Sequence, residues 1–306
     1  MKKRIALEIT GALAGGGYRR YTESLLAGLA RQGPENEYFL FGVFQRGFPE
    51  RALALDVPQG PNWHFALERF PQGLLLPLEE FTPLRYQERV LARLGVDLVH
   101  GLGTRTPRLD RIPSAVTVHF SGLFDFPRAW DRFYLNRLAA RSVRQAREVI
   151  AISEFTKREA VSAWGLDPAK VAVIAHGAPP PEFRPATPAE VAARPKEPPF
   201  FLFVGATGPS KNARLLAAAF RIFKKRHPAS PHRLVLAGPD GADRPWMEEH
   251  LGAAGLSAAA DFLGPVPPAR IHELFRRAFA AVLPSTGEGF ALPALEAMAC
   301  GVPVAA

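Results

Sequence analysis

The chain has 306 residues, of which 47% are hydrophobic and 22% charged, and its formal net charge at pH 7 is +9. This composition indicates a globular protein, and the length exceeds what one ordinary core needs, so we expect two domains. It excludes a membrane span of the roughly 18 to 20 apolar residues required. It also excludes an internal disulfide framework, because Cys300 is the only cysteine, and this favours the cytoplasm.

The N-terminal half alternates predicted strands with helical or looped segments. A strand over residues 4 to 10 is followed by a glycine loop and a helix from about residue 18 to residue 31. The segment does not resemble a signal peptide, because Glu8 interrupts its apolar stretch. Further strands are predicted at "EYFLFGVF", "DLVHGLG", "SAVTVHF", "EVIAIS" and "KVAVIAHG". This alternation is typical of a parallel sheet covered on both faces, so we expect a Rossmann-like domain over residues 1–180.

A proline-dense stretch over residues 178–199 interrupts this pattern. The prolines predict a linker without regular structure, and we assign it to residues 181–199. The pattern then restarts with strands at "FFLFVGA", "RLVLAGP" and "AAVLP" and helices near residues 212–227, 245–255 and 268–279. The fold class expected is therefore α/β, with two Rossmann-like domains facing across a cleft and the second over residues 200–306.

The positive net charge admits anionic partners. Arg137, Arg141 and Arg144 recur at helical spacing. They predict either a solvated helix face or a basic stripe in peripheral contact with an anionic membrane on the cytoplasmic face. Nucleic acid is not an expected partner, because no recognition motif accompanies the charge.

Ligands of parallel sheets bind at the carboxyl ends of the strands. The loop "GALAGGGYRRY" lies at such an end, but it is neither a dinucleotide fingerprint nor a phosphate-loop NTPase motif. It predicts either a plain turn or a segment whose bare backbone at Gly16 and Gly17 approaches a ligand.

Two segments of the second half suggest a site for an anion. Lys211 stands where a helix begins, beside free backbone N–H groups that suit a diphosphate. In "GEGFALPALEAMACG", Pro293 suits the first turn of a helix, Glu288 precedes a glycine, and Glu296 stands one turn inside. The helix start would attract a phosphate, and the two carboxylates would accept hydrogen bonds from hydroxyls. A nucleotide-sugar is a ligand that carries both kinds of group.

The string "EGFALPALEAMACGVPV" resembles closely the signature of the retaining glycosyltransferases of the GT-B fold, in which seven residues separate two glutamates. The likeness extends along nearly all of the chain, and it includes "GGGYRRYTESLLAGL", "DLVHGLGTRTP", "VIAISEFTKREAV", "LFVGATGPSKNARLLAAAF" and "DFLGPVPPARIHELFRRAFAAVLPS". It implies transfer of a hexose from a nucleotide-diphosphate-sugar to a glycan, lipid or small-molecule acceptor, with the first domain on the acceptor side and the second domain binding the nucleotide-sugar. It implies neither a cofactor nor a metal, because the lysine and the helix end supply the positive charge that the diphosphate needs.

The resemblance also implies a role for particular residues. Glu296 would bind the ribose and Glu288 the donor sugar, while Lys211 would neutralise the diphosphate. His119 would touch the sugar, although a lone histidine at a strand end is also commonly structural, and backbone near Val266 would meet the base. The backbone groups expected to help with the diphosphate are those of Gly16, Gly17, Gly289, Phe290, Ala291 and Leu292.

Three departures from the family pattern keep alternatives open. Phe120 stands where many relatives have Asp, and Ser210 where many have Arg. The final "GVPVAA" predicts a buried parallel strand without a covering helix, which favours a truncated second domain. A catalytically inactive nucleotide-sugar binder and a nucleotide-sugar epimerase of the same architecture are the alternative functions. The base, the sugar, the acceptor and the oligomeric state are not predicted.

Overall fold

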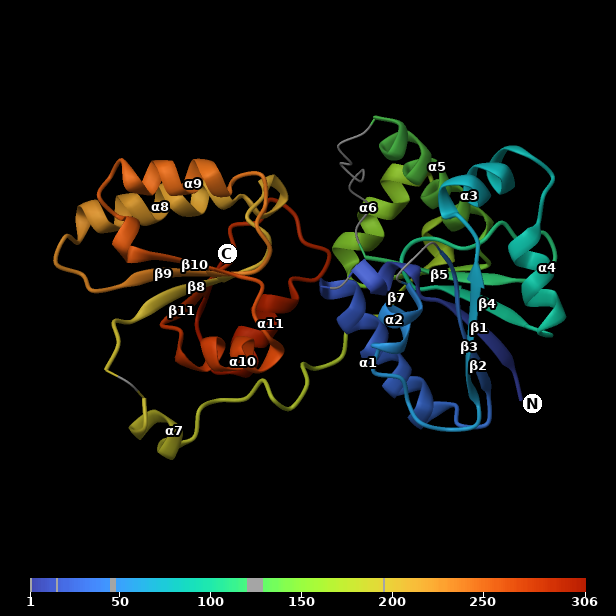
Figure 1. Cartoon of the computed structure of the whole chain (residues 1–306), viewed down its shortest axis with the longest axis horizontal. Helices are drawn as coiled ribbons and strands as arrows, with labels where there is room; N and C mark the ends of the chain where they lie inside the picture. Colours follow the sequence, from blue (N-terminus) through green and yellow to red (C-terminus); the bar gives the residue numbers. More distant parts are fainter. Residues whose placement is uncertain (1, 15, 45–47, 120–128, 195) are drawn as a thin grey trace. The chain divides into compact units, whose positions relative to one another are not determined.

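The computed structural model describes residues 2–14, 16–44, 48–119, 129–194 and 196–306. The chain divides into two compact units, Met1–Gly177 and Ala178–Ala306, each with its own sheet (Figure 1). Within the described residues, no helix combines the length and the apolar character needed to cross a membrane.

The first unit is built on a parallel sheet of seven strands in the order β3-β2-β1-β4-β5-β6-β7. From β1 the chain proceeds outward to β2 and β3, and it then returns to β4 on the other side of β1, so that the strand order reverses between β1 and β4. Ligands of open parallel sheets bind at such a switch point, outside the carboxyl ends of the strands. The strands are β1 (Arg4–Glu8), β2 (Glu37–Phe44), β3 (Trp63–Arg69), β4 (Leu98–Gly101), β5 (Ser114–Val118), β6 (Glu148–Ala151) and β7 (Val171–Val173).

Helices cover both faces of this sheet, as the sequence predicts. Successive residues of a strand point to opposite faces. Leu7 of β1 accordingly packs with Leu26, whereas its neighbour Ala6 packs with Leu75 and Leu91. The helices are α1 (Gly16–Gln32), α2 (Phe48–Leu53), α3 (Gln72–Phe81), α4 (Tyr86–Arg93), α5 (Ala129–Gln145) and α6 (Glu154–Trp164).

The second unit is a smaller parallel sheet with the order β10-β9-β8-β11-β12. Helices α8 and α9 lie on one face of it, and α10 and α11 lie on the other (Figure 1). The strand order reverses between β8 and β11. Its elements are β8 (Phe200–Val204), α8 (Ala213–Arg226), β9 (Arg233–Ala237), α9 (Arg244–Gly252), β10 (Ala260–Gly264), α10 (Pro268–Arg277), β11 (Ala280–Val282), α11 (Leu292–Ala299) and β12 (Val304–Ala305).

The expected α/β class with two parallel-sheet domains is confirmed, but two strands were missed. These are β3 and β10, and each is the outermost strand of its sheet. An edge strand is partly open to solvent, so it does not need the continuous apolar run that identifies a buried strand. Half-buried residues therefore dominate in both.

The proline-dense linker contains a short helix, α7 (Pro188–Ala192), so the prediction that it lacks regular structure is wrong. Pro188 stands in the first turn, where its missing N–H is not needed. Thr187 and Glu190 form a reciprocal capping box, and Arg184 donates to both carboxylate oxygens of Glu190 at 2.8 and 2.9 Å. Local capping thus overrides the proline content.

The three arginines at helical spacing on α5 do not form a free basic stripe. Arg137 and Arg141 donate to the two carboxylate oxygens of Glu80 on α3 at 3.0 and 2.9 Å, and Arg144 donates to the Trp164 carbonyl. The side chains of Glu80 and Arg141 are only 4% and 13% exposed. Both predictions for this stripe, a solvated face and a lipid-binding face, are therefore wrong for Arg141, whose charge stabilises a buried carboxylate.

Candidate donor-binding site

The loop that carries Lys211 follows β8, the central strand of the second sheet. It is fixed against the loop after β9 by a close approach of the two backbones. A Cβ atom on Gly238, whose φ is +146°, would lie 2.3 Å from the Gly205 carbonyl oxygen, so only glycine fits there. Thr207 is buried, and its hydroxyl accepts a hydrogen bond from the Gly241 N–H at 2.9 Å. Lys211 therefore projects from an anchored loop.

Glu288 lies in the loop after β11, and its carboxylate meets Lys211. The Lys211 Nζ atom donates to Glu288 Oε1 at 2.5 Å, and the Ser285 hydroxyl donates to the same oxygen at 2.6 Å. The side chains of Lys211 and Glu288 are 29% and 24% exposed. The structure thus brings together two residues that the sequence assigned to one site, 77 positions apart.

Topology explains this meeting. β8 and β11 are neighbouring parallel strands, and the strand order reverses between them. The loops that follow them emerge at the same edge of the sheet, at the switch point where ligands of such sheets bind.

Helix α11 begins directly after this loop, at Leu292, with Pro293 in its first turn as predicted. Within the described part of the chain, the N–H groups of Ala291 and Leu292 donate no hydrogen bond. Such groups, at the positive end of the helix dipole, attract anions. Glu296 lies on the same helix and is 1% exposed, so its carboxylate is closed to solvent.

Ala291 is strained, because its φ of +61° lies in the left-handed region. This conformation costs a residue with a Cβ roughly 1 to 2 kcal/mol. We expect Ala291→Gly to raise the free energy of unfolding of the second unit by about 1 kcal/mol, measured by thermal unfolding. Ala294→Gly, in a helical conformation three residues beyond, is the matched control and should lower the free energy of unfolding. Equal effects of both substitutions would contradict the strain.

The other predicted donor residues of the second unit lie in loops around this site. Gly289 and Phe290 connect Glu288 to α11, and Ala291 packs partly against the core. Val266 follows β10, the edge strand, and it also packs partly against the core. In the part of the chain that the structure describes, no hydrogen bond or ion pair joins Val266 to Lys211 or Glu288, so its place near the base remains a prediction.

The remaining predicted residues belong to the first unit. Gly16 and Gly17 form the exposed first turn of α1 rather than the predicted glycine loop, after a short 3-10 helix over Thr10–Ala14. The predicted helix start at residue 18 is therefore two residues late. Phe120, which was singled out as a departure from the family pattern, lies outside the described residues.

His119 follows β5 and is 9% exposed, inside a cluster of rings. Its ring centroid lies 4.6 Å from that of Tyr18, 4.5 Å from that of Tyr21 and 5.9 Å from that of His176. Its Nε2 atom lies 2.9 Å from the Leu102 carbonyl oxygen, which can only accept, so the proton is on Nε2. Burial lowers the pKa of His119 to about 4, so the ring is neutral at pH 7.

Ser285 and Thr207 were not identified from the sequence. Ser285 stands three positions before Glu288 and holds its carboxylate, and Thr207 anchors the Lys211 loop. A short hydroxyl residue in a loop carries little signal of its own. The proximity of Ser285 to Glu288 in the same strand-to-helix loop is the one feature that could have indicated it.

Comparison with solved structures identifies the fold. Sucrose-phosphate synthase from Thermosynechococcus elongatus matches with a TM-score of 0.72 at 21% identity, covering 99% of this chain and 80% of that one. The Anabaena protein HepE in complex with UDP and glucose matches with a TM-score of 0.67 at 18% identity, over the same shares. Two parallel-sheet α/β units with this architecture define the GT-B fold.

Sequence comparison identifies the family. The profile of Glycosyltransferase Family 4 matches residues 15–182, and that of Glycosyl transferases group 1 matches residues 188–306. The D-inositol 3-phosphate glycosyltransferase of Acidothermus cellulolyticus is 31% identical, over 98% of this chain and 72% of that protein. The one of Gordonia bronchialis is 36% identical over 54% of this chain and 38% of that protein. The chain belongs to Glycosyltransferase Family 4, and it is a glycosyltransferase.

Proposed function

We propose that the protein is a retaining glycosyltransferase that moves a hexose from a nucleotide-diphosphate-sugar to a hydroxyl of its acceptor. The observation that carries the proposal is the meeting of Lys211 and Glu288 beside the start of α11. A cation, a carboxylate and unbonded backbone N–H groups at one switch point are the groups that a sugar joined to a diphosphate requires.

Within this proposal, the diphosphate binds Lys211 and the N–H groups of Ala291 and Leu292. Glu288 accepts hydrogen bonds from hydroxyls of the donor sugar, and Glu296 accepts those of the ribose. Because the Glu296 carboxylate is buried, ribose binding requires the groups that cover it to move.

The diphosphate and Glu288 compete for the same ammonium group. A nucleoside diphosphate that takes Lys211 leaves Glu288 with the Ser285 hydroxyl alone, whereas a nucleotide-sugar offers the carboxylate new hydroxyl partners. The ion pair therefore favours the donor over the product nucleotide, which helps the product to leave.

Lys211 and the helix end supply the positive charge that a divalent metal supplies in other transferases, so we propose metal-independent transfer. A neutral His119 is able to hydrogen-bond a sugar hydroxyl, but in the structure its Nε2–H is occupied by Leu102. Retention is carried over from the family resemblance, with no protein nucleophile assigned.

The two relatives described above are D-inositol 3-phosphate glycosyltransferases, and this favours a phosphorylated polyol as the acceptor. Contact with an anionic membrane has no support from Arg137 and Arg141, since both are paired with Glu80. A cytoplasmic location remains a prediction from the cysteine content.

The proposal is tested with UDP, GDP, UDP-glucose and GDP-mannose in thermal unfolding, followed by transfer assays in EDTA. One nucleotide-sugar should raise the melting temperature by several degrees at 100 times its Kd. The product should keep the anomeric configuration of the donor by NMR. No shift with any nucleotide would overturn the proposal, inverted product would overturn retention, and a strict manganese requirement would overturn metal independence. Binding of the nucleotide-sugar without transfer would favour a catalytically inactive binder. Appearance of an epimerised nucleotide-sugar would favour the epimerase.

A further inference from the structure

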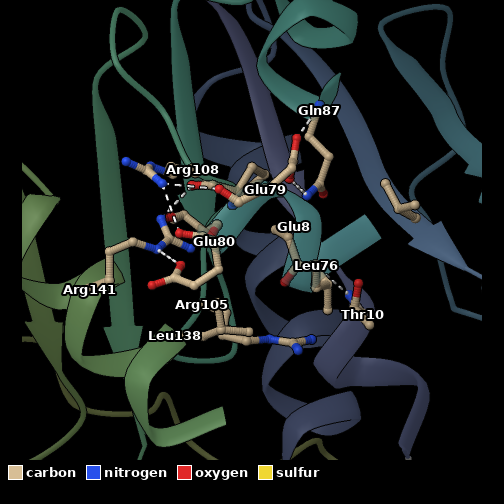
Figure 2. Close-up of a pocket in the computed structure, with 13 residues that line it drawn as sticks. Glu8, Thr10, Leu76, Glu79, Glu80, Gln87, Arg105, Arg108, Leu138 and Arg141 are labelled. Carbon is tan, nitrogen blue, oxygen red and sulfur yellow. Dashed lines mark hydrogen bonds and ion pairs between the residues drawn. The ribbon is translucent and has the colours of Figure 1, made fainter. Parts of the chain in front are cut away.

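A small cavity lies in the first unit, at the carboxyl ends of β1 and β4 (Figure 2). Its volume is about 30 Å³, enough for one or two groups of the size of water or a hydroxyl. Glu8 ends β1, and Arg105 follows β4, so both residues line the cavity at the switch point of the seven-stranded sheet. This is the place where the topology directs a ligand of this unit.

Most charged side chains of the cavity are already satisfied. Glu80 binds Arg137 and Arg141, and the carboxylate of Glu79 accepts from the backbone and the side chain of Gln87. In Figure 2 the dashed bonds among Glu79, Glu80, Gln87 and Arg141 and their neighbours lie beside a second group, formed by Glu8, Thr10 and Arg105.

The main chain around Arg105 is anchored on both sides. The Thr104 N–H donates to the Thr117 carbonyl at 3.0 Å, and the Thr106 N–H donates to the Ser142 hydroxyl at 3.1 Å. Thr104 is a β-branched residue with a φ of +65°, a strained conformation that tends to occur at functional sites. A Cβ on Gly101 would lie 2.0 Å from the Arg105 carbonyl oxygen, so glycine permits this tight return of the chain.

The Arg105 side chain has no such anchor. Its guanidinium group forms no hydrogen bond or ion pair with any residue that the structure describes. Glu8 is 7% exposed, and one of its carboxylate oxygens accepts from the Thr10 N–H at 3.2 Å. Burial raises the pKa of Glu8, and the charge of Arg105 acts against that rise, so the two groups interact electrostatically without touching.

We infer that Glu8 and Arg105 bind the acceptor, and that the acceptor is a polyol carrying a phosphate. One hydroxyl of the polyol enters the cavity and donates to Glu8, while the guanidinium group binds the phosphate outside it. A guanidinium group offers five N–H donors in a fork that matches phosphate oxygens. This inference rests on the proposed function, because it assigns the acceptor of the same reaction.

The test is equilibrium binding of D-inositol 3-phosphate and of unphosphorylated inositol to the whole chain, by calorimetry. We expect Arg105→Gln to weaken binding of the phosphorylated polyol at least tenfold and to leave inositol binding unchanged, whereas Arg105→Lys should retain part of the preference. Glu8→Gln should weaken both ligands by a few-fold. Arg93→Gln, at an exposed arginine of α4, is the control and should change nothing.

Nucleotide-sugar binding is measured on the same samples, and it separates the two proposals. A variant that still binds the nucleotide-sugar like the wild type is folded, so its loss of phosphate preference is specific. Wild-type chain that binds the nucleotide-sugar but neither polyol, or an Arg105→Gln chain with an unchanged phosphate preference, would overturn the acceptor site alone. Absence of nucleotide binding would instead count against the proposed function.

Discussion

Glu288→Gln should strengthen binding of the nucleoside diphosphate and weaken binding of the nucleotide-sugar. The wild-type ammonium group of Lys211 is held by Glu288 at 2.5 Å, so the diphosphate must break this pair. A partly exposed pair of this kind is worth up to about 1 kcal/mol, which corresponds to about fivefold tighter diphosphate binding once the carboxylate is removed. The nucleotide-sugar shares this gain through its own diphosphate, but its sugar hydroxyls lose a charged acceptor worth about 2 to 3 kcal/mol, so its net binding should weaken about tenfold. Calorimetric titration with both ligands measures the ratio of the two Kd values.

Lys211→Ala should behave differently, because it removes the cation itself. Both ligands should then bind at least tenfold more weakly, and most of the thermal shift should be lost. Ser210→Ala, next to Lys211 and exposed, is the matched control and should leave both Kd values unchanged. If Glu288→Gln weakened both ligands equally, the carboxylate would not compete with the diphosphate, and the preference for donor over product would have another origin.

The first unit should lose stability on mild acidification because of its buried histidines. The pKa of His119 is about 4 in the folded chain and about 6.5 when unfolded, so the unfolded chain binds a proton between these values and the folded chain does not. The contribution of His119 is thus fully present above pH 6.5 and is lost as the pH falls toward 4. Between pH 7 and pH 5 this amounts to about 2 kcal/mol. Burial lowers the pKa of His100 to about 4 as well, which adds a loss of the same sign.

Urea unfolding followed by tryptophan fluorescence measures this effect. Of the four tryptophans, Trp63, Trp130 and Trp164 belong to the first unit, so a Trp246→Phe background reports that unit alone. In this background, the free energy of unfolding of His119→Asn should fall by about 2 kcal/mol less between pH 7 and pH 5 than that of the parent. His227→Asn, at an exposed histidine of the second unit, is the control and should leave the difference unchanged. Identical pH dependence of parent and His119→Asn would show that the ring is not held neutral.

The sequence predicts most of the fold because buried parallel strands need apolar runs on both faces. "EYFLFGVF" and "FFLFVGA" therefore identified β2 and β8, and both are covered on two sides. The same reasoning missed β3 and β10, since an edge strand tolerates charged residues such as Glu68. It also missed α7, where a capping box starts a helix in spite of the prolines around it.

The residues of the candidate donor site can be predicted from the sequence. Lys211, Glu288 and Glu296 are identified from their positions beside a strand end or a helix start. Their mutual relations were not predictable, because Lys211 and Glu288 are 77 residues apart and meet only through the pairing of β8 with β11. Glu296 was expected to face a ligand, but whether a side chain is covered depends on neighbours that lie far away along the chain. The ring cluster around His119 and the pairing of Arg137 and Arg141 with Glu80 were hidden for the same reason.

By itself the sequence determined the alternation of strands and helices, the two-domain class and the loops that carry the charged groups, because these depend on local periodicity and on single residues. The tertiary structure alone decided which charges meet, which are buried and which stay open to a ligand. Arg141 and Arg105 make the difference plain. Both arginines line the same cavity. The carboxylate of Glu80 neutralises Arg141, whereas Arg105 forms no hydrogen bond or ion pair with the residues that the structure describes. The cost of burying a charge is set by such distant partners, and spacing along the chain does not contain them.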